Sequence, residues 1–119
     1  MAEFKDLIGK KIIEITGLEV GSDLVVFVCE DGKQFKMYHD QDCCESVQVE
    51  DVCGDIAHLI GQTVLSAEES SNNDDPPAFS ESHTWTFYRI ATNRGMVVIR
   101  WLGESNGYYA ESVDFEEID

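Results

Sequence analysis

The chain repeats itself, and this repeat limits the folds that are open to it. The triplet Leu-Ile-Gly occurs at residues 7–9 and again at 59–61, and the triplet Glu-Ser-Val occurs at 45–47 and again at 111–113. Between the triplets of each copy lies a hairpin signal, flanked by β-branched and aromatic residues. Because the same predicted elements recur in the same order, we predict an internal duplication.

Each predicted repeat is one short helix followed by about four strands. The repeats span approximately residues 2–53 and 54–119, with an acidic, proline-containing loop inserted at about 70–82. The helices are expected at 3–8 and 55–60, each followed by a glycine that ends it. These elements predict a single α+β domain, predominantly β. The repeats would form one antiparallel or mixed β structure with two short helices against it.

The strands are predicted from runs that are rich in β-branched and aromatic residues. Asp31-Gly32 separates two such runs and is a strong hairpin signal, and Asn93-Arg94-Gly95 separates two more. Val97-Val98-Ile99 is apolar on both faces, which indicates a central strand. The predicted strands are 11–15, 23–30, 33–39, 45–52, 64–69, 83–92, 96–102 and 108–118.

The formal net charge of −16 comes from 24 Asp and Glu residues against 8 Lys and Arg residues. Such a surface repels nucleic acid and anionic membranes, and it attracts basic proteins or cations. No apolar run is long enough to cross a bilayer, and the first residues do not form a signal peptide. We therefore expect a cytoplasmic protein with no direct nucleic-acid or membrane binding. The alternative is that the acidity serves solubility alone.

The stretch from His39 to Asp55 holds three of the four cysteines and suggests zinc, which binds thiolates and imidazoles. Adjacent cysteines on an extended strand point to opposite faces, however, and no Cys-x-x-Cys pair is present. Cys43 and Cys53 share the parity of the apolar valines between them, so we predict buried thiols and no cofactor. The zinc alternative would use His39, Asp42, Cys43, Cys44 and Cys53.

The sequence contains no recognisable catalytic motif. It lacks a nucleophile elbow, a papain-type cysteine surround, a phosphate-binding glycine loop and EF-hand spacing. We therefore predict a protein that is not an enzyme, and keep a hydrolase only as a remote alternative. The segment from Trp101 to Tyr109 places aromatic residues beside a Gly/Ser/Asn loop. It is either an ordinary hairpin turn or a surface for a partner or small ligand.

The motifs MYHDQDCCESV, EDVCGD, WTFY and GESNGYYAESVDF resemble those of an uncharacterised family of small domains. That family is of unknown function and is widespread in tailed bacteriophages and their hosts. The resemblance covers nearly the whole chain, from Leu7 to Phe115. It implies a phage-encoded accessory protein that acts in the host cytoplasm, and it brings no catalytic residues with it.

Charge and resemblance together predict a non-enzymatic accessory protein that binds and modulates a host protein with a basic surface. An acidic face of this kind can mimic nucleic acid, as small inhibitors of host defence nucleases do, so an anti-defence or anti-CRISPR role is a candidate. The alternative is a metal- or small-ligand-binding protein using the His39–Cys53 segment or the Trp101–Tyr109 turn. Self-association into a homo-oligomer is left open. The partner-binding candidates are Asp74, Asp75, Glu81, Trp101, Asn106, Tyr108, Tyr109, Glu116 and Glu117.

Overall fold

The computed structural model describes residues 3–39, 45–72, 82–105 and 112–118, and strands dominate these segments. Within them, no helix has the length and apolar character that a membrane span requires. The elements in chain order are η1 (Phe4–Leu7), β1 (Lys11–Thr16), β2 (Leu24–Cys29), β3 (Gln34–Tyr38), β4 (Ser46–Cys53), η2 (Ile56–His58), β5 (Gln62–Thr63), β6 (Ser66–Asn72), β7 (Ser82–Thr92), β8 (Gly95–Ser105) and β9 (Asp114–Ile118).

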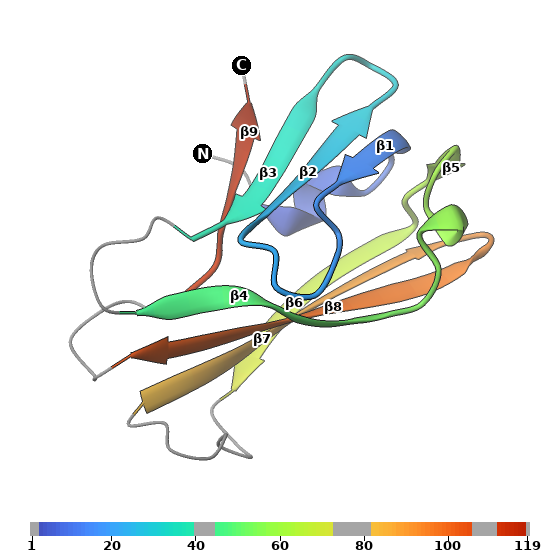
Figure 1. Cartoon of the computed structure of the whole chain (residues 1–119). Helices are drawn as coiled ribbons and strands as arrows, with labels where there is room; N and C mark the ends of the chain where they lie inside the picture. The colour runs from blue at the N-terminus through green and yellow to red at the C-terminus, as the bar shows by residue number, and fades with distance from the viewer. Residues whose placement is uncertain (1–2, 40–44, 73–81, 106–111, 119) are drawn as a thin grey trace.

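The strands form two antiparallel sheets that pack face to face (Figure 1). The first sheet has the order β5-β1-β2-β3-β9, and the second has the order β4-β8-β7-β6. The inward-facing apolar residues of both sheets make one continuous core. The fold is therefore a β-sandwich with β6 and β9 among its edge strands.

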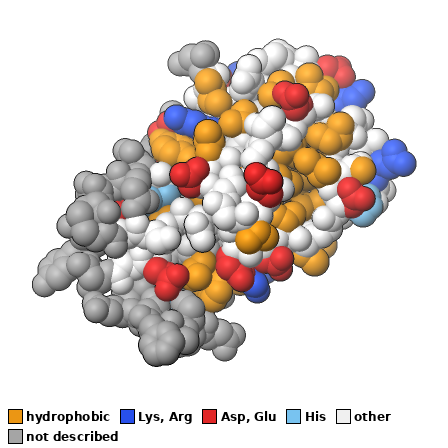
Figure 2. Space-filling model, in the orientation of Figure 1, with side chains coloured by type: hydrophobic (Ala, Val, Ile, Leu, Met, Phe, Trp, Pro, Cys, Tyr) orange, Lys and Arg blue, Asp and Glu red, His pale blue; other side chains and the backbone are white. Residues whose placement is uncertain are grey.

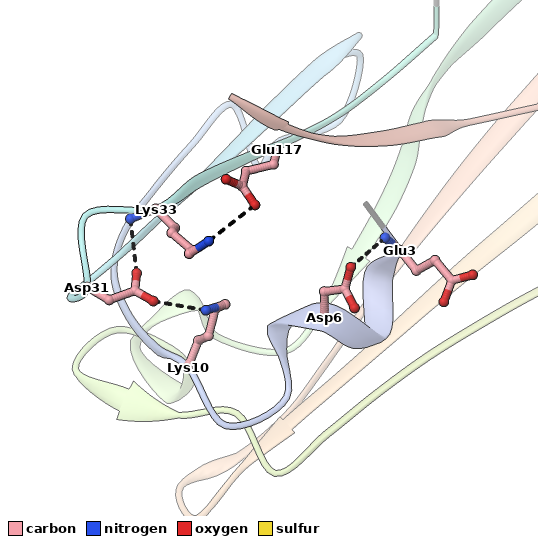
Figure 3. Close-up of polar contacts among 6 residues, drawn as sticks. All are labelled: Glu3, Asp6, Lys10, Asp31, Lys33 and Glu117. Atoms are coloured by element: carbon pink, nitrogen blue, oxygen red, sulfur yellow. Dashed lines mark hydrogen bonds and ion pairs between the residues drawn. The ribbon is translucent and has the colours of Figure 1, made fainter. Parts of the chain in front are cut away.

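The two predicted helices are short 3-10 turns, so the α+β expectation was wrong about helices. η1 has four residues and η2 has three, too few to close successive turns of α-helix. The capping signals were nevertheless present in the sequence. The Asp55 carboxylate accepts a hydrogen bond from the Ala57 amide at 2.9 Å. At η1, Glu3 and Asp6 cap each other reciprocally, and the Glu3 amide donates to Asp6 at 2.9 Å (Figure 3).

The predictions for the two hairpins and the central strand are confirmed. β2 and β3 pair across the Asp31-Gly32 turn, where Gly32 adopts a φ of 90°. β7 and β8 pair from Thr92 and Gly95 outward, across Asn93-Arg94. β8 lies between β4 and β7, as its apolar sequence indicates.

Each half of the chain contributes its last strand to the sheet of the other half. β1, β2 and β3 form a meander whose free side is filled by β9, and β6, β7 and β8 form a meander whose free side is filled by β4. The two Glu-Ser-Val segments therefore lead into strands with equivalent topological positions.

Backbone contacts between the halves are reciprocal. The Gly9 amide donates to the Val64 carbonyl at 2.9 Å, and the Gly61 amide donates to the Ile12 carbonyl at 2.7 Å. In sequence, Gly61 follows Gly9 by the same interval by which Val64 follows Ile12. A pseudo-twofold axis between the halves would produce this exchange.

Side-chain contacts repeat in the same way. Lys36 of β3 pairs with Glu116 of β9 at 3.9 Å, and Arg100 of β8 donates through Nε to Glu50 of β4 at 2.7 Å. Apart from the two-residue strand β5, which extends only the first sheet, strand order, amide bonds and ion pairs match between the halves, as they would after a duplication. The common origin of the halves stays a prediction.

Cys53 is exposed, which corrects the prediction that it is a buried thiol. β4 carries a bulge between Val49 and Asp51, where its register with β8 shifts. The extra residue reverses the alternation, so Val52, opposite the buried Ile99, faces the core, and Cys53 faces out. Cys43 lies outside the described residues.

We expect Cys53 and Cys29 to differ sharply in reactivity towards a thiol reagent. Cys29 is 1% exposed and burial raises its pKa, so little reactive thiolate is available there. With Ellman's reagent under native conditions, Cys53→Ser should lose one fast-reacting equivalent and Cys29→Ser none. An unchanged fast phase in Cys53→Ser would contradict the assigned bulge.

Candidate binding groove

A groove of about 620 Å³ lies between β6 and β9, where the edges of the two sheets come together around η1. It draws its walls from three segments that are far apart in the sequence. We call it the β6/β9 groove. Its lining residues are Glu3, Phe4, Lys5, Ala67, Glu69, Ser70, Ser71, Val113, Asp114, Phe115 and Glu116.

The apolar part of the groove is built around Phe4, the first residue of η1. Its ring packs against Tyr88 of β7, with centroids 4.8 Å apart, and against Phe115 of β9, with centroids 5.6 Å apart. Phe4 thereby joins the two sheets where they open. Both contacts are edge-to-face and the ring is 2% exposed, so Phe4 belongs to the packed core at this end of the sandwich.

The β9 wall is positioned by a buried histidine. His39 Nδ1 lies 2.7 Å from the Ser112 carbonyl oxygen, and Nε2 lies 3.0 Å from a Glu45 carboxylate oxygen. The side chains of His39 and Glu45 are 4% and 1% exposed. The imidazole therefore links the end of β3, the start of β4 and the approach to β9. The Tyr88 hydroxyl adds a longer bond, of 3.5 Å, to the Val113 carbonyl.

The hydrogen-bond partners of His39 favour a ring that carries two protons. A carbonyl and a carboxylate only accept hydrogen bonds, so both ring nitrogens must donate, as they do in imidazolium. Burial lowers the His39 pKa, but the bonds to Glu45 and Ser112 and the nearby charges of Glu45 and Asp114 outweigh it and raise the pKa above its usual value. The pair is a charged clamp that holds the β9 wall.

A carboxylate projects into the groove from the inner face of β6. Glu69 stands opposite the fully buried Tyr88 in the β6–β7 register, so its side chain points towards the space between the sheets. It stays exposed because β6 is an edge. Partial burial, and then the charge of Glu3, raise the Glu69 pKa. A carboxylate held against a like charge favours the approach of a cation.

The lining of the groove is strongly acidic. Four acidic residues, Glu3, Glu69, Asp114 and Glu116, line it together with one basic residue, Lys5. Lys5 already pairs with Glu3 at 3.0 Å, and both side chains are about two-thirds exposed. An exposed pair of this kind is easily exchanged for another partner. The groove combines an apolar floor with an anionic rim.

On the face shown in Figure 2, most carboxylates lie apart from one another, between hydrophobic and neutral atoms. Some carboxylates outside the groove are paired: Lys10 binds Asp31 at 2.9 Å, and Lys33 binds Glu117 at 3.6 Å (Figure 3). The groove brings four acidic residues together, which makes it the better candidate for recognition of a cationic partner.

Only part of the predicted partner-binding set falls on described residues. Glu116 lines the groove and pairs with Lys36, and Glu117 lies on β9 beside Lys33. Trp101 is not a surface residue: it is 0% exposed, and its indole Nε1 donates to Met37 Sδ at 3.0 Å. The remaining candidates lie outside the described residues: Asp74, Asp75, Glu81, Asn106, Tyr108 and Tyr109.

Two proposed ligands of the alternative zinc site, His39 and Cys53, lie too far apart to bind the same metal ion. His39 is bound to Glu45, just before β4, and Cys53 is the last residue of β4. A strand of this length separates its ends by about 25 Å, so the two cannot share a metal ion. In the part of the chain that the structure describes, no three His, Cys, Asp or Glu residues cluster suitably for a metal. Asp42, Cys43 and Cys44 fall outside it.

Sequence reasoning missed Phe4, Glu69 and Asp114. One signal for Glu69 was present, since Ala67, Glu69 and Ser71 alternate on the face of β6 that should be apolar. Polar residues on the inner face of a strand indicate an open edge of a sandwich. Which other segments would line that opening could not be read from local pattern.

The comparisons with known proteins give a family without an activity. No curated protein and no solved structure matches the chain. The family model described as "Domain of unknown function (DUF7448)" matches residues 5–115, which is nearly the entire chain, and the chain therefore belongs to this family.

Proposed function

We propose that this protein is a non-enzymatic binding protein whose β6/β9 groove takes a lysine- or arginine-rich segment of a partner protein. The single observation that carries the proposal is the lining of the groove: four carboxylates against one lysine, above an apolar floor. A basic segment would gain favourable charge contacts at the rim. Its apolar side chains would be removed from water against Phe4 and Phe115.

The net charge of −16 supports the same proposal at longer range. A strongly negative protein attracts basic partners from a distance and raises their rate of association. The groove would then supply the specific contacts. Long-range charge raises the association rate and orients the partner, and buried contacts slow dissociation of the complex.

The phage resemblance makes a host protein the partner that we favour. Proteins that bind nucleic acid contact its phosphates through Lys and Arg. Our proposal is that the acidic groove competes for such a basic segment in a host protein, with a defence protein as one candidate. The experiment below uses a model basic peptide and does not depend on the identity of the partner protein.

A titration with a model peptide tests the proposal. The probe is a dye-labelled Lys-Val-Lys-Val-Lys-Val-Lys heptapeptide, followed by fluorescence anisotropy. We expect Glu69→Gln/Glu116→Gln to raise the Kd by about 2- to 30-fold, because two rim charge pairs contribute about 0.2–1 kcal/mol each. Binding should also weaken from 50 to 300 mM salt, as the Debye length shortens below about 10 Å.

Glu14→Gln/Glu19→Gln is the matched control. It removes the same charge from two exposed carboxylates on β1 and the following loop, and two strands separate β1 from β9. Its Kd should remain within about twofold of the wild type. An equal loss in both double variants would show that only net charge matters. No binding of the peptide at 50 mM salt would contradict the proposal itself.

A further inference from the structure

We infer that the partner segment binds as an extended strand added to the free edge of β9, with its backbone hydrogen-bonded to Phe115. This inference rests on the proposed function and specifies how the groove is occupied. Strand addition supplies main-chain hydrogen bonds, while alternate side chains provide the specificity.

The equivalent edge of the other sheet is covered by backbone hydrogen bonds from another segment of the chain. β4 is the counterpart of β9, and the loop between β1 and β2 closes its outer edge. The Gly21 amide donates to the Val49 carbonyl at 2.8 Å, and the Val49 amide donates to the Ser22 carbonyl at 2.8 Å. Both polar backbone groups of Val49 therefore point away from β8 and are satisfied by the turn at Gly21 and Ser22, where Gly21 has a φ of 90°.

The loop that makes this cover is shaped for it. Gly17, at its start, has a φ of 78°, and a Cβ there would lie 2.1 Å from the Leu24 carbonyl oxygen. Only glycine allows that close approach of backbone to backbone. The cover over β4 is therefore a built feature of the fold.

Phe115 is the counterpart of Val49. Each is the third residue after the serine of its Glu-Ser-Val segment, and each lies opposite one of two contacting core residues, Trp101 for Val49 and Met37 for Phe115. By this equivalence the amide and carbonyl of Phe115 point away from β3, towards the open edge. Among the described residues, no backbone group from another segment bonds to them.

The surroundings of this edge select a basic, alternating segment. Successive side chains of an added strand would point to opposite sides. One set would face the apolar floor at Phe4, and the other would face the rim carboxylates Asp114 and Glu116. Charged residues on an edge strand repel the same edge of a second copy and so oppose self-association. They attract a strand of opposite charge.

Amide hydrogen exchange on the intact protein, followed residue by residue by NMR, tests the mode of binding. In the free protein the Phe115 amide should exchange much faster than the Val49 amide, which is bonded to Ser22. With the Lys/Val heptapeptide at about 100 times its Kd, Phe115 exchange should slow by up to about 100-fold. Val49 exchange should not change.

A second peptide separates strand addition from charge attraction. Methylating the backbone nitrogen of the central valine keeps the charge and side chains but removes a donor and blocks close pairing. We expect its Kd to rise by about 10-fold, the cost of one or two lost backbone bonds. A Kd within twofold of the parent would overturn the inference, because charge alone would then explain the affinity.

The outcomes distinguish the inference from the function on which it rests. Binding without added protection at Phe115 contradicts strand addition and leaves the groove proposal standing. A Phe115 amide that is already as protected as Val49 in the free protein would mean that the chain covers its own edge, which also overturns the inference. Absence of any peptide binding overturns both.

Discussion

Replacing His39 with leucine should lower the free energy of unfolding by about 3–5 kcal/mol, because it leaves the Glu45 carboxylate buried without its counter-charge. The Glu45 side chain is 1% exposed, so water cannot replace the lost imidazolium. A loss of this size is a large fraction of the 5–15 kcal/mol that typically stabilises a domain. Urea denaturation followed by tryptophan fluorescence measures it.

The double variant His39→Leu/Glu45→Leu is the control for this prediction. Removing both side chains leaves no buried carboxylate without its counter-charge, so the double variant should be more stable than His39→Leu alone. Simple additivity, with the double variant losing the sum of two large single effects, would contradict a direct pair. A loss below about 1 kcal/mol in His39→Leu would mean that the carboxylate is not buried.

The same pair predicts how stability depends on pH. The pKa of His39 is raised in the folded protein, so its contribution is fully present below the unfolded pKa of about 6.5 and is lost as the pH rises through the folded value. The free energy of unfolding of the wild type should therefore fall as the pH rises above about 6.5. His39→Leu should lack that fall. An identical pH profile in both proteins would contradict the assigned imidazolium.

Replacing Trp101 with alanine should cost about 3–5 kcal/mol of stability, which makes it a core variant rather than a binding variant. The indole is 0% exposed and touches Met37, so it joins the two sheets at the centre of the sandwich. Alanine would leave a large cavity there. Trp101→Phe should lose less, since it keeps an aromatic ring and gives up chiefly the indole contact with sulfur.

Chemical denaturation and peptide binding together decide this prediction. Both Trp101 variants should keep the wild-type Kd for the Lys/Val heptapeptide under conditions where they remain folded, because the side chain does not line the β6/β9 groove. Lost binding with unchanged stability would return Trp101 to the surface, where the sequence first suggested a binding turn.

The strands and hairpins could be predicted because their signals are local. Asp31-Gly32 favours a tight turn whatever surrounds it, and the apolar run Val97-Val98-Ile99 favours a central position in a sheet. The 3-10 turns were overestimated as helices because capping and a following glycine look the same for either. What separates the two is the number of residues between the cap and the next strand.

Features that depend on tertiary pairing could not be predicted from the sequence. The bulge after Val49 reverses the alternation of inward and outward side chains in β4. No residue there is a recognised signal for a bulge, so the sequence pattern assigned Cys53 to the wrong face. The exchange of β4 and β9 between the sheets is likewise a matter of long-range pairing. Repeated triplets indicated two equivalent strands but not which sheet each would join.

The candidate groove contains one of the predicted partner-binding residues, Glu116. Excess negative charge drew attention to this residue, and its part in binding stays a prediction. Glu69 escaped notice because the groove forms only when η1, β6 and β9 come together, and these are separated by most of the chain. A hydrophobic pattern can indicate that a face is open, but it does not name the neighbours across the opening.

The location of the basic segment is measured most directly by chemical-shift mapping of the backbone amides during titration with the Lys/Val heptapeptide. The proposal predicts that the largest perturbations fall on two stretches, residues 67–71 of β6 and residues 113–116 at β9, with small changes around Glu14 and Glu19. Perturbations of equal size at Glu14, Glu19 and the groove would contradict it, since they would show that the peptide follows surface charge and does not occupy the groove.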